Sequence, residues 1–326
     1  MIIIDGENSF LNFPTIPEMT PEAQKYMADN GLGEINHQVL SVSNRPGAGT
    51  ATLSFNELDV SAWHNMLPSL RAGTEGQLIT ILQMTFNILR REGREISTAN
   101  IRHYAQQIAE ASNMIHRSQI PAIVRALHCP ELDLFDDTNL TTVLNPEVLF
   151  QPGLITTINV NSLDMNRRRV VTLYILELLH RYKVLDRIND PGVVVAIDEC
   201  ESLYPHKPTA REREFVDRIA ERTAAVTMLG RKRYYSLFMV THLTSDVSPE
   251  VVKLVSNHMA FRCSGGEDKH ISTYIGPEFV DEINSLQTGF CRMKTNTSTV
   301  VQSGTNATIK LPFVGFATDL TIVDTT

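Results

Sequence analysis

Short apolar runs alternate with longer amphipathic stretches through most of the chain. The strand-like runs span residues 1–4, 154–160, 193–197 and 237–241, and stretches with helical spacing span residues 168–182 and 211–229. Short apolar runs of this kind are typical of strands buried on both faces of a sheet. Their alternation with helices predicts an α/β fold, with a mostly parallel sheet and helices on both faces.

Residues 56–150 show helical periodicity instead, and the apolar positions that carry it include Leu78, Ile81, Leu82, Met84, Phe86 and Leu89. We therefore divide the chain into an α/β core of residues 1–55 and 151–326 and a helical insert of residues 56–150. Each predicted helix of the insert has only one apolar stripe. The insert should therefore pack on one face of the sheet. Residues 289–314 alternate β-branched and polar side chains around Ser303-Gly304 and predict a terminal hairpin.

Composition excludes some classes of protein. The 326 residues are 42% hydrophobic, enough for one large core with a smaller subdomain, and the net charge of −8 argues against a generally basic surface. A basic pore in a ring stays compatible with that charge. The sequence has no membrane-spanning run and no signal-peptide pattern, so we expect a cytoplasmic protein. The four cysteines have no C-x-x-C spacing and are expected to be reduced.

The most informative local pattern is the apolar run Val193–Ile197 followed by Asp198 and Glu199. The carboxyl end of a strand in a parallel sheet opens into the crevice where such sheets bind ligands. There Asp198 can hold Mg²⁺, and Glu199 can orient or deprotonate a water that attacks a γ-phosphate. The same residues also suit a buried strand that ends in a solvated acidic turn. We expect the ends of strands 1–4, 193–197 and 237–241 to lie side by side, bringing Asp198, Glu199 and His242 together.

Five segments of the chain, in order, resemble the HerA/FtsK superfamily of P-loop ATPases, and HerA more closely than FtsK. They are IIIDGENSF, GLITTINVNSL, VVVAIDECESLYP, LGRKRYYSLFMVTHLTSDVSPEVVKLVSNHMAFR and LQTGF. The resemblance spans nearly the whole chain and implies a RecA-like core, of which this chain is the C-terminal part. It implies that Asp198 binds magnesium, that Glu199 activates water, and that Arg231 contacts the γ-phosphate across a subunit boundary.

Other residues match the family's pattern in part. Asp5 and Glu7 match an acidic loop near the nucleotide, and they equally suit a turn. Lys232 follows Arg231 in a Gly-Arg-Lys segment, which without the resemblance would be a solvated helix end. After the sensor strand the family has Gln-Arg-Pro, whereas this chain has His242 followed by leucine and threonine. Histidine can still donate a hydrogen bond to phosphate or water. Glu201 replaces a histidine of the family.

The phosphate-binding Walker A loop, G-x-x-x-x-G-K-[ST], is absent from the sequence, and the glycine-rich residues 46–50 contain no lysine. In the resembled fold the strand that carries this loop precedes the one formed here by residues 1–4 and lies inside the sheet. Its removal would expose unpaired backbone groups. Either a segment upstream of Met1 supplies this strand, or another element fills the gap. We expect no ATP turnover by the chain alone.

The function implied by the resemblance is that of an ATP-driven DNA translocase or helicase of the HerA type. Such a protein would use ATP and Mg²⁺ and act as a homo-hexameric ring around duplex DNA, with a nuclease partner in DNA repair. The alternatives are a non-catalytic ATPase-like ring or partner-binding subunit, and a conjugation or DNA-packaging ATPase of the same superfamily. An intact Glu199 and Arg231 favour an enzyme, and the missing lysine favours a non-catalytic subunit.

Overall fold

The computed structural model describes the chain from Met1 to Lys310, apart from residues 14–17, 30, 32, 44–48, 61, 63–65, 68–74, 113–114, 136–140, 189, 211, 264, 288–289 and 296–305. The centre of the fold is a five-stranded sheet in which every pair of neighbours is parallel. Its strands, in spatial order, are β2 (Asn36–Ser41), β5 (Leu154–Asn159), β1 (Ile2–Asp5), β6 (Val193–Ile197) and β7 (Tyr235–Met239). The predicted α/β class and parallel sheet are confirmed.

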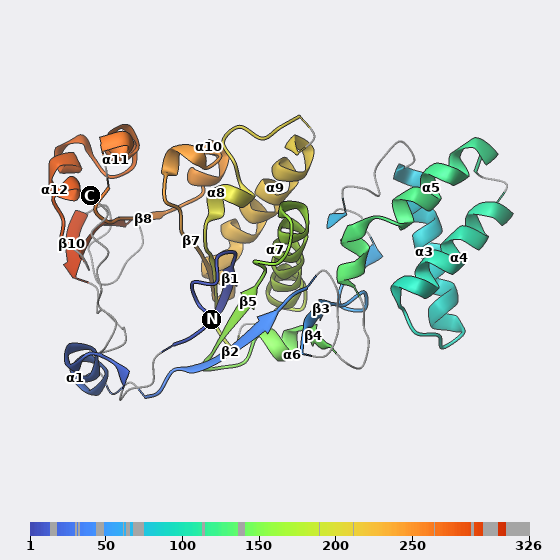
Figure 1. Ribbon diagram of the computed structural model, residues 1–326, viewed down its shortest axis with the longest axis horizontal. Helices are drawn as coiled ribbons and strands as arrows, with labels where there is room; N and C mark the ends of the chain where they lie inside the picture. Colours follow the sequence, from blue (N-terminus) through green and yellow to red (C-terminus); the bar gives the residue numbers. More distant parts are fainter. Residues whose placement is uncertain are drawn as a thin grey trace.

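One face of this sheet is covered by helices α7 (Met165–His180) and α9 (Arg213–Leu229), which pack against each other (Figure 1). A π-helix, Arg181–Leu185, continues α7. We predicted α7 to be amphipathic, but every residue from Arg169 to Leu179 is buried. The helix is enclosed because it lies between the sheet, α9 and the insert. The buried guanidinium of Arg169 forms an ion pair, since its Nη1 lies 2.8 Å from a carboxylate oxygen of Glu212.

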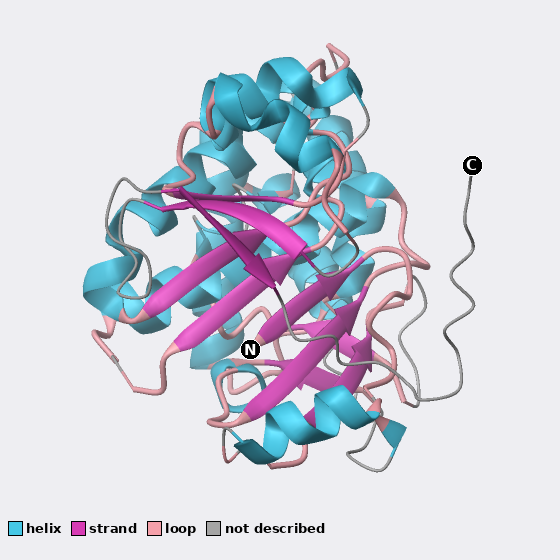
Figure 2. Cartoon of the chain, turned by 90° about the vertical axis from the view of Figure 1, so that its left-hand side faces the viewer, coloured by secondary structure: helices cyan, strands magenta, loops and turns pink. Residues whose placement is uncertain are grey.

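The opposite face is covered less completely near β7. Val194 on β6 and Phe238 on β7 are 39% and 45% exposed, and Val240, just after β7, is 39% exposed. These positions alternate with residues such as Val195, which is fully buried under α7 and α9. Figure 2 looks at this side of the molecule.

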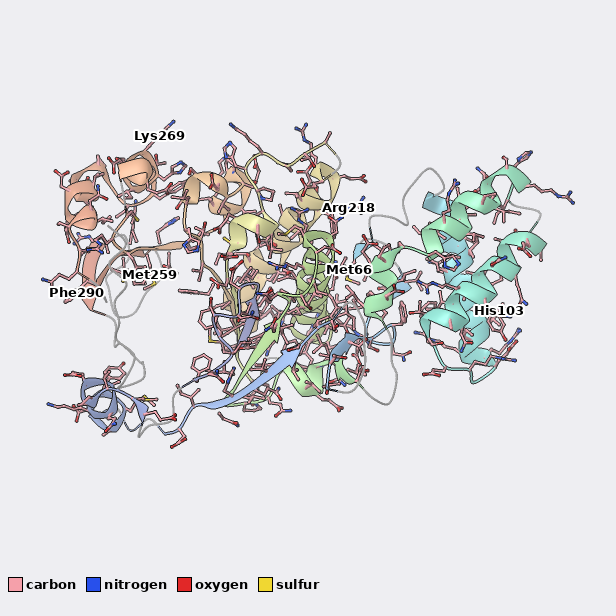
Figure 3. All side chains as sticks on the ribbon, viewed as in Figure 1. Met66, His103, Arg218, Met259, Lys269 and Phe290 are labelled. Atoms are coloured by element: carbon pink, nitrogen blue, oxygen red, sulfur yellow. The ribbon has the colours of Figure 1, made fainter. Side chains whose placement is uncertain are left out.

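The insert lies beyond α7, on the side away from the sheet (Figure 1). Its elements are α3 (Glu75–Arg91), α4 (Thr98–Ala111), a 3₁₀ turn (Arg117–Gln119), α5 (Ile120–Leu127), a 3₁₀ helix (Pro130–Leu134), β4 (Thr142–Leu144) and α6 (Pro146–Leu149). Strand β4 pairs in parallel with β3 (Ala51–Leu53), which precedes the insert. Its apolar side chains belong to the same cluster as those of the sheet. Phe135 joins the two parts, because its ring stacks on Phe55 at 4.6 Å and meets Tyr174 of α7 edge-on at 6.1 Å. Met66, fully buried, lies at the same boundary (Figure 3).

A second sheet follows α8 (Cys200–Leu203) and α10 (Pro249–Val252). It is antiparallel, in the order β10 (Asn306–Lys310), β9 (Phe290–Thr295), β8 (Asn257–Ala260), and it carries α11 (Asp268–Tyr274) and α12 (Val280–Asn284). The predicted terminal hairpin is confirmed in its two strands, while its turn at Ser303-Gly304 lies outside the described residues. Helix α1 (Pro21–Asp29) lies apart from these elements in Figure 1. None of the helices described here is long and apolar enough to cross a membrane.

Candidate functional site

The loops that leave β1, β6 and β7 meet at the carboxyl edge of the sheet. The backbone N–H of Asp198 donates to the carbonyl of Ile4 at 3.2 Å, and Cys200 N–H donates to the carbonyl of Val240 at 2.9 Å. Strand β6 lies between β1 and β7, as expected for the strand that carries the acidic residues. The structure therefore places the ends of the three strands side by side, and brings Asp198, Glu199 and His242 together at the carboxyl edge of the sheet, the crevice where sheets of this kind bind ligands.

Glu199 occupies a strained position at the start of α8. Its backbone is left-handed, with φ 49° and ψ 46°, which costs a non-glycine residue about 1 kcal/mol or more. Its side chain is 23% exposed, and one carboxylate oxygen lies 3.6 Å from Nε2 of His242. His242 itself is 81% exposed at the side chain. The sharp turn lifts Glu199 out of the strand direction and aims it toward the end of β7.

Neighbouring carboxylates change the protonation of Glu199. Burial raises the pKa of Glu199, and the negative charges of Glu7, Asp198 and Glu201 raise that pKa further. The pKa of Asp198 is also raised, mainly by burial, while a hydrogen bond from the backbone N–H of Glu199 and the charge of His242 act in the opposite direction. A carboxylate with a raised pKa is a better proton acceptor near neutral pH.

Asp5 and Glu7 have different places in the loop after β1. Asp5 is fully buried, and its carboxylate accepts hydrogen bonds from the backbone N–H groups of Glu7, Ser9 and Phe10 at 3.0, 3.1 and 2.9 Å. Glu7 is exposed on the side toward Glu199. Asp5 thus fixes the loop and Glu7 faces the crevice. From the sequence, Asp5 and Glu7 could each form a turn or lie near a nucleotide. The turn role is seen for Asp5, and a contact with nucleotide stays a prediction.

Arg168, on the first turn of α7, was missed by the sequence analysis. Its Nε donates to the carbonyl of Leu163 and its Nη2 to that of Asn161, at 3.0 and 2.9 Å. A side chain on Gly6 would place its Cβ 2.9 Å from Nη1 of Arg168 and 3.9 Å from a carboxylate oxygen of Glu199. Gly6 therefore leaves room beside the loop for both the guanidinium group of Arg168 and the carboxylate of Glu199. The signal available in the sequence was a basic residue in the first turn of the helix that follows a core strand.

Glu201 was also assigned no chemistry from the sequence. One of its carboxylate oxygens accepts a hydrogen bond from the backbone N–H of His242 at 3.4 Å. The side chain is half-buried and adds to the negative charge around Glu199. Glu201 therefore links α8 to the loop after β7 and helps to position His242.

Arg231 and Lys232 are not brought to this crevice. They lie in the short 3₁₀ segment Gly230–Arg233, immediately before β7, and therefore at the amino edge of the sheet. A strand of five residues spans roughly 17 Å. Within one chain these two residues lie a strand's length from Glu199, so a role at a γ-phosphate would have to be played in a second copy.

The crevice has one carboxylate suited to magnesium. In the described ranges no group of three or more His, Cys, Asp or Glu side chains is arranged to hold a metal ion. Protein sites for Mg²⁺ often use only one or two carboxylates, with waters and phosphate oxygens as the other ligands. Asp198, half-buried at the end of β6, fits that pattern.

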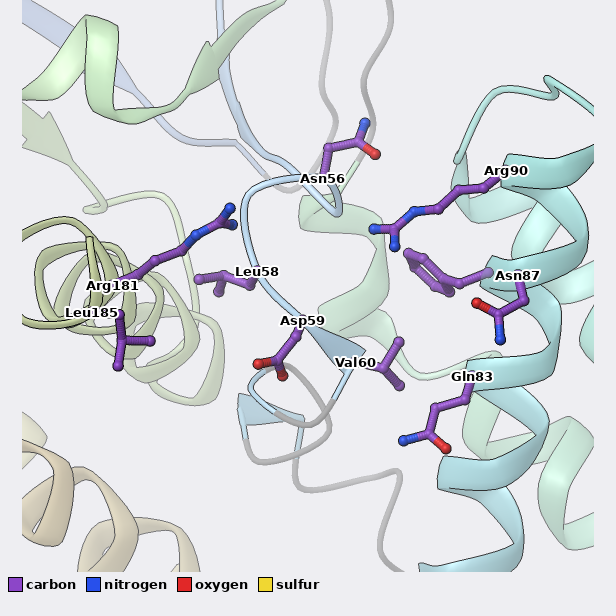
Figure 4. A pocket seen from close by; sticks show the side chains of 10 residues that line it. Asn56, Leu58, Asp59, Val60, Gln83, Asn87, Arg90, Arg181 and Leu185 are labelled. Atoms are coloured by element: carbon purple, nitrogen blue, oxygen red, sulfur yellow. The ribbon is translucent and has the colours of Figure 1, made fainter.

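A separate cavity of about 610 Å³ lies between the insert and the core, away from these carboxylates (Figure 4). Its walls come from α3, from the loop after β3 and from the π-helix, and they include Leu58, Phe86, Arg90, Arg181 and Leu185. The two guanidinium groups come from opposite walls (Figure 4). The acidic crevice, not this cavity, is the site that the sequence predicts.

No protein-family model and no curated protein sequence matches this chain. Among solved structures, VirB4 of Thermoanaerobacter pseudethanolicus matches over 95% of this chain and 80% of its own, with 13% identity and a TM-score of 0.60. The bacterial conjugative coupling protein TrwBdeltaN70, in its trigonal form with sulphate, matches over 97% of this chain and 78% of its own, with 14% identity and a TM-score of 0.58. The chain has the fold of these proteins.

The likeness to these two structures confirms, at the level of the fold, the resemblance found in the sequence. B204, the DNA-packaging ATPase from Sulfolobus Turreted Icosahedral Virus, also matches, with 17% identity over 48% of this chain and 66% of its own. Its TM-score is 0.33.

Proposed function

We propose that this chain works in a DNA-translocating ATPase. The observation that carries the proposal is the meeting of Asp198, Glu199 and His242 at the carboxyl edge of a parallel sheet, on the fold shared with VirB4 and TrwB. Ligands of such sheets bind at this edge. Phosphoryl transfer needs positioned charges more than covalent help, and this crevice offers an acidic ligand, a base and a hydrogen-bond donor.

Each residue of the crevice has a role in that chemistry. Magnesium, held by Asp198, would neutralise charge on the phosphates of ATP. Glu199 accepts the proton of the attacking water, and its raised pKa suits it to that task. His242 lies 3.6 Å from Glu199 and can donate a hydrogen bond to phosphate or water from the end of β7. Glu201 holds the backbone of His242 in place.

The assembly is part of the same proposal. Arg231 and Lys232 lie at the opposite edge of the sheet from Glu199. They can serve a nucleotide only if a second copy of the chain presents them, as in a homo-hexameric ring. Duplex DNA in the pore of that ring, cytoplasmic localisation and a nuclease partner in DNA repair complete the HerA-type form of the proposal. A conjugation ATPase is the second candidate, favoured by the likeness to a conjugative coupling protein over 97% of this chain.

The experiment compares phosphate release by the chain with release by a form extended upstream of Met1 to include a Walker A loop, each with and without duplex DNA. We expect no turnover by the chain, because its sequence supplies no lysine-bearing cradle for the phosphates. The extended form should hydrolyse ATP and be stimulated by DNA. Robust hydrolysis by the unextended chain would refute the mechanism.

Two variants of the extended form test the residues. Glu199→Gln keeps the shape of the side chain and removes the base, so turnover should fall by about 100-fold or more while nucleotide binding remains. Arg231→Ala should lose most of its ATP turnover in the assembled ring. Glu110→Gln, an exposed carboxylate on α4, is the matched control and should retain full activity. Nucleotide binding and ring formation without turnover in the extended form would favour the non-catalytic alternative.

A further inference from the structure

The cavity between the insert and the core is a site distinct from the acidic crevice. Arg168 lies beside the crevice and Arg181 lines the cavity, at opposite ends of α7 and its π-helical continuation. At 1.5 Å per residue, the helical segment between them spans roughly 20 Å. The cavity volume of about 610 Å³ falls within the range of roughly 300–1,000 Å³ that sites for small molecules occupy. The cavity is therefore large enough for a ligand of its own.

Two guanidinium groups line this cavity, one from the insert and one from the core (Figure 4). Arg90, in the last turn of α3, lies over the ring of Phe86, with its Cζ 5.7 Å from the ring centroid. Arg181 donates from Nη1 to the backbone carbonyl of Glu57. An aromatic ring and a carbonyl orient a guanidinium group without neutralising it. Both positive charges are therefore positioned in advance, which lowers the entropic cost of binding a ligand.

The charge of the cavity wall favours an anion. The carboxylate of Asp186 lies 3.9 Å from Nε of Arg181, and because both side chains are about half exposed this pair is weak. Among the described residues, no acidic side chain lies within 4.0 Å of Arg90. The described wall carries one carboxylate, that of Asp59, which accepts from the backbone N–H of Ala62 at 2.8 Å. Two positive groups and one negative group thus line a cavity in a chain whose net charge is −8.

Helix α3 presents a polar face to the cavity. Gln83, Asn87 and Arg90 line it together, because residues four and seven positions apart lie on one side of a helix. The side-chain amides of Gln83 and Asn87 form no hydrogen bond with another described residue, and each offers a donor and an acceptor. Leu58, which is buried, and Leu185, which is 64% exposed, add apolar surface. The cavity therefore suits a ligand with an anionic group, polar atoms and an apolar part.

We propose that this cavity binds a small phosphate ester of nucleotide size, with its phosphate between Arg90 and Arg181 and its organic part against the amides of α3 and Leu58. A guanidinium group binds two phosphate oxygens at once, and a phosphate monoester has enough oxygens to serve two such groups, whereas a carboxylate does not. Glutamine and asparagine amides pair with the donors and acceptors at the edge of a nucleobase. The ligand joins the insert to the core. This site needs no Mg²⁺ and does not depend on the proposed function.

Isothermal titration calorimetry of the 326-residue chain tests this site without relying on ATP hydrolysis. The probes are AMP, GMP, CMP and UMP, each titrated once in EDTA and once with Mg²⁺. We expect at least one of them to bind with a dissociation constant on the order of 10–100 μM, the affinity typical of a ligand of this size, and to bind equally well in EDTA. Inorganic phosphate and the matching nucleoside should each bind about 10-fold more weakly or less, because each makes only part of the contacts.

Variants with a matched control locate the ligand. Arg90→Gln and Arg181→Gln each remove one phosphate contact and should raise the dissociation constant about 10-fold or more. Asn87→Trp fills the cavity from the exposed face of α3 without changing the charge, and should abolish binding. Arg91→Gln changes the adjacent exposed arginine, which does not line the cavity, and should bind as the wild type does. A last-turn arginine also stabilises its own helix, so circular dichroism must show that each variant is folded.

Each outcome decides the proposal. Binding that is lost in folded Arg90→Gln and Arg181→Gln but kept in Arg91→Gln would sustain it, whether or not the protein hydrolyses ATP. Absence of binding by all four nucleotides at about 1 mM, or equal affinity for inorganic phosphate, would overturn it. Equal weakening by Arg91→Gln would show a general charge effect and overturn the cavity as the site. Binding that requires Mg²⁺ and survives Arg90→Gln would place the nucleotide in the acidic crevice, which would overturn this inference and leave the proposed function standing.

Discussion

Asp5 organises the loop after β1, and its replacement by asparagine tests how that loop is held. The carboxylate is fully buried, with one oxygen accepting from Glu7 and Ser9 and the other from Phe10. Asparagine has the same shape, but one acceptor oxygen becomes an NH₂ group. In Asp5→Asn the amide oxygen can keep the first two bonds. The NH₂ group then faces the N–H of Phe10, which is left without an acceptor.

The expected cost follows from these contacts. A part-buried N–H without a partner costs about 1–3 kcal/mol, and the two remaining bonds each lose some of the strength that a charged acceptor gives, about 0.5–1 kcal/mol. Asparagine also avoids the cost of burying a charge, which offsets part of the loss. We expect a net loss of about 2 kcal/mol in the free energy of unfolding. That is a large part of a stability of about 5–15 kcal/mol.

Urea unfolding followed by circular dichroism measures this loss as a lower midpoint with an unchanged slope. Asp186→Asn is the control, because the side chain of Asp186 is 50% exposed and lies 3.9 Å from Arg181. That variant should lose less than about 0.5 kcal/mol. If both variants unfold at the same urea concentration, the three hydrogen bonds to Asp5 do not hold the loop, and the account of the site must change.

Three further predictions concern strain and charge. Glu199→Gly should be more stable than Glu199→Ala by about 1 kcal/mol in thermal unfolding, because glycine adopts the left-handed backbone freely; equal stability would contradict the strain. The pKa of Glu199 is raised above 4.5, so wild-type stability falls as the pH rises from 4.5 through that raised pKa. Glu199→Gln should therefore gain on the wild type as the pH rises above 4.5 in urea titrations. Hydrogen bonds from Thr209, and then the Arg169 guanidinium, lower the pKa of Glu212 from 4.5 to about 2. Glu212→Gln should therefore lower the free energy of unfolding by about 2–3 kcal/mol at neutral pH. The difference from wild type should shrink as the pH falls from 4.5 through 2. A pH-independent difference for Glu212→Gln would count against the ion pair with Arg169.

Four of the five core strands could be predicted because each is a short apolar run, whereas β2, an edge strand with mostly polar residues, was not predicted. Four of the five residues of Val193–Ile197 are buried, as an uninterrupted apolar run predicts. The acidic residues that follow then had to lie at the carboxyl edge, because parallel strands all end at that edge. The expected meeting of Glu199 and His242 therefore depended only on β6 and β7 being neighbours.

Other features depended on contacts that no local pattern carries. Helix α7 begins at Met165, three residues before the predicted start, because the side chain of Asp164 caps it by accepting from the N–H of Arg167. Its burial on all sides depends on the insert, which is distant in the sequence. The position of Arg168 beside the crevice depends on two loop carbonyls and on the missing side chain of Gly6.

The separation of charge along β7 constrains how the site can be completed. Acidic side chains gather at the carboxyl edge around Glu199, whereas the basic segment Gly230–Arg233 lies at the amino edge. The strand between them is roughly 17 Å long, about twice the screening length of charges at physiological salt. One copy of the chain therefore cannot use its own basic segment to balance the charge of a nucleotide in its crevice. In the proposed ATPase, positive charge at the phosphates must come from the lysine of a Walker A loop, from Arg168, or from the basic segment of a second copy, and only the last of these makes activity depend on assembly.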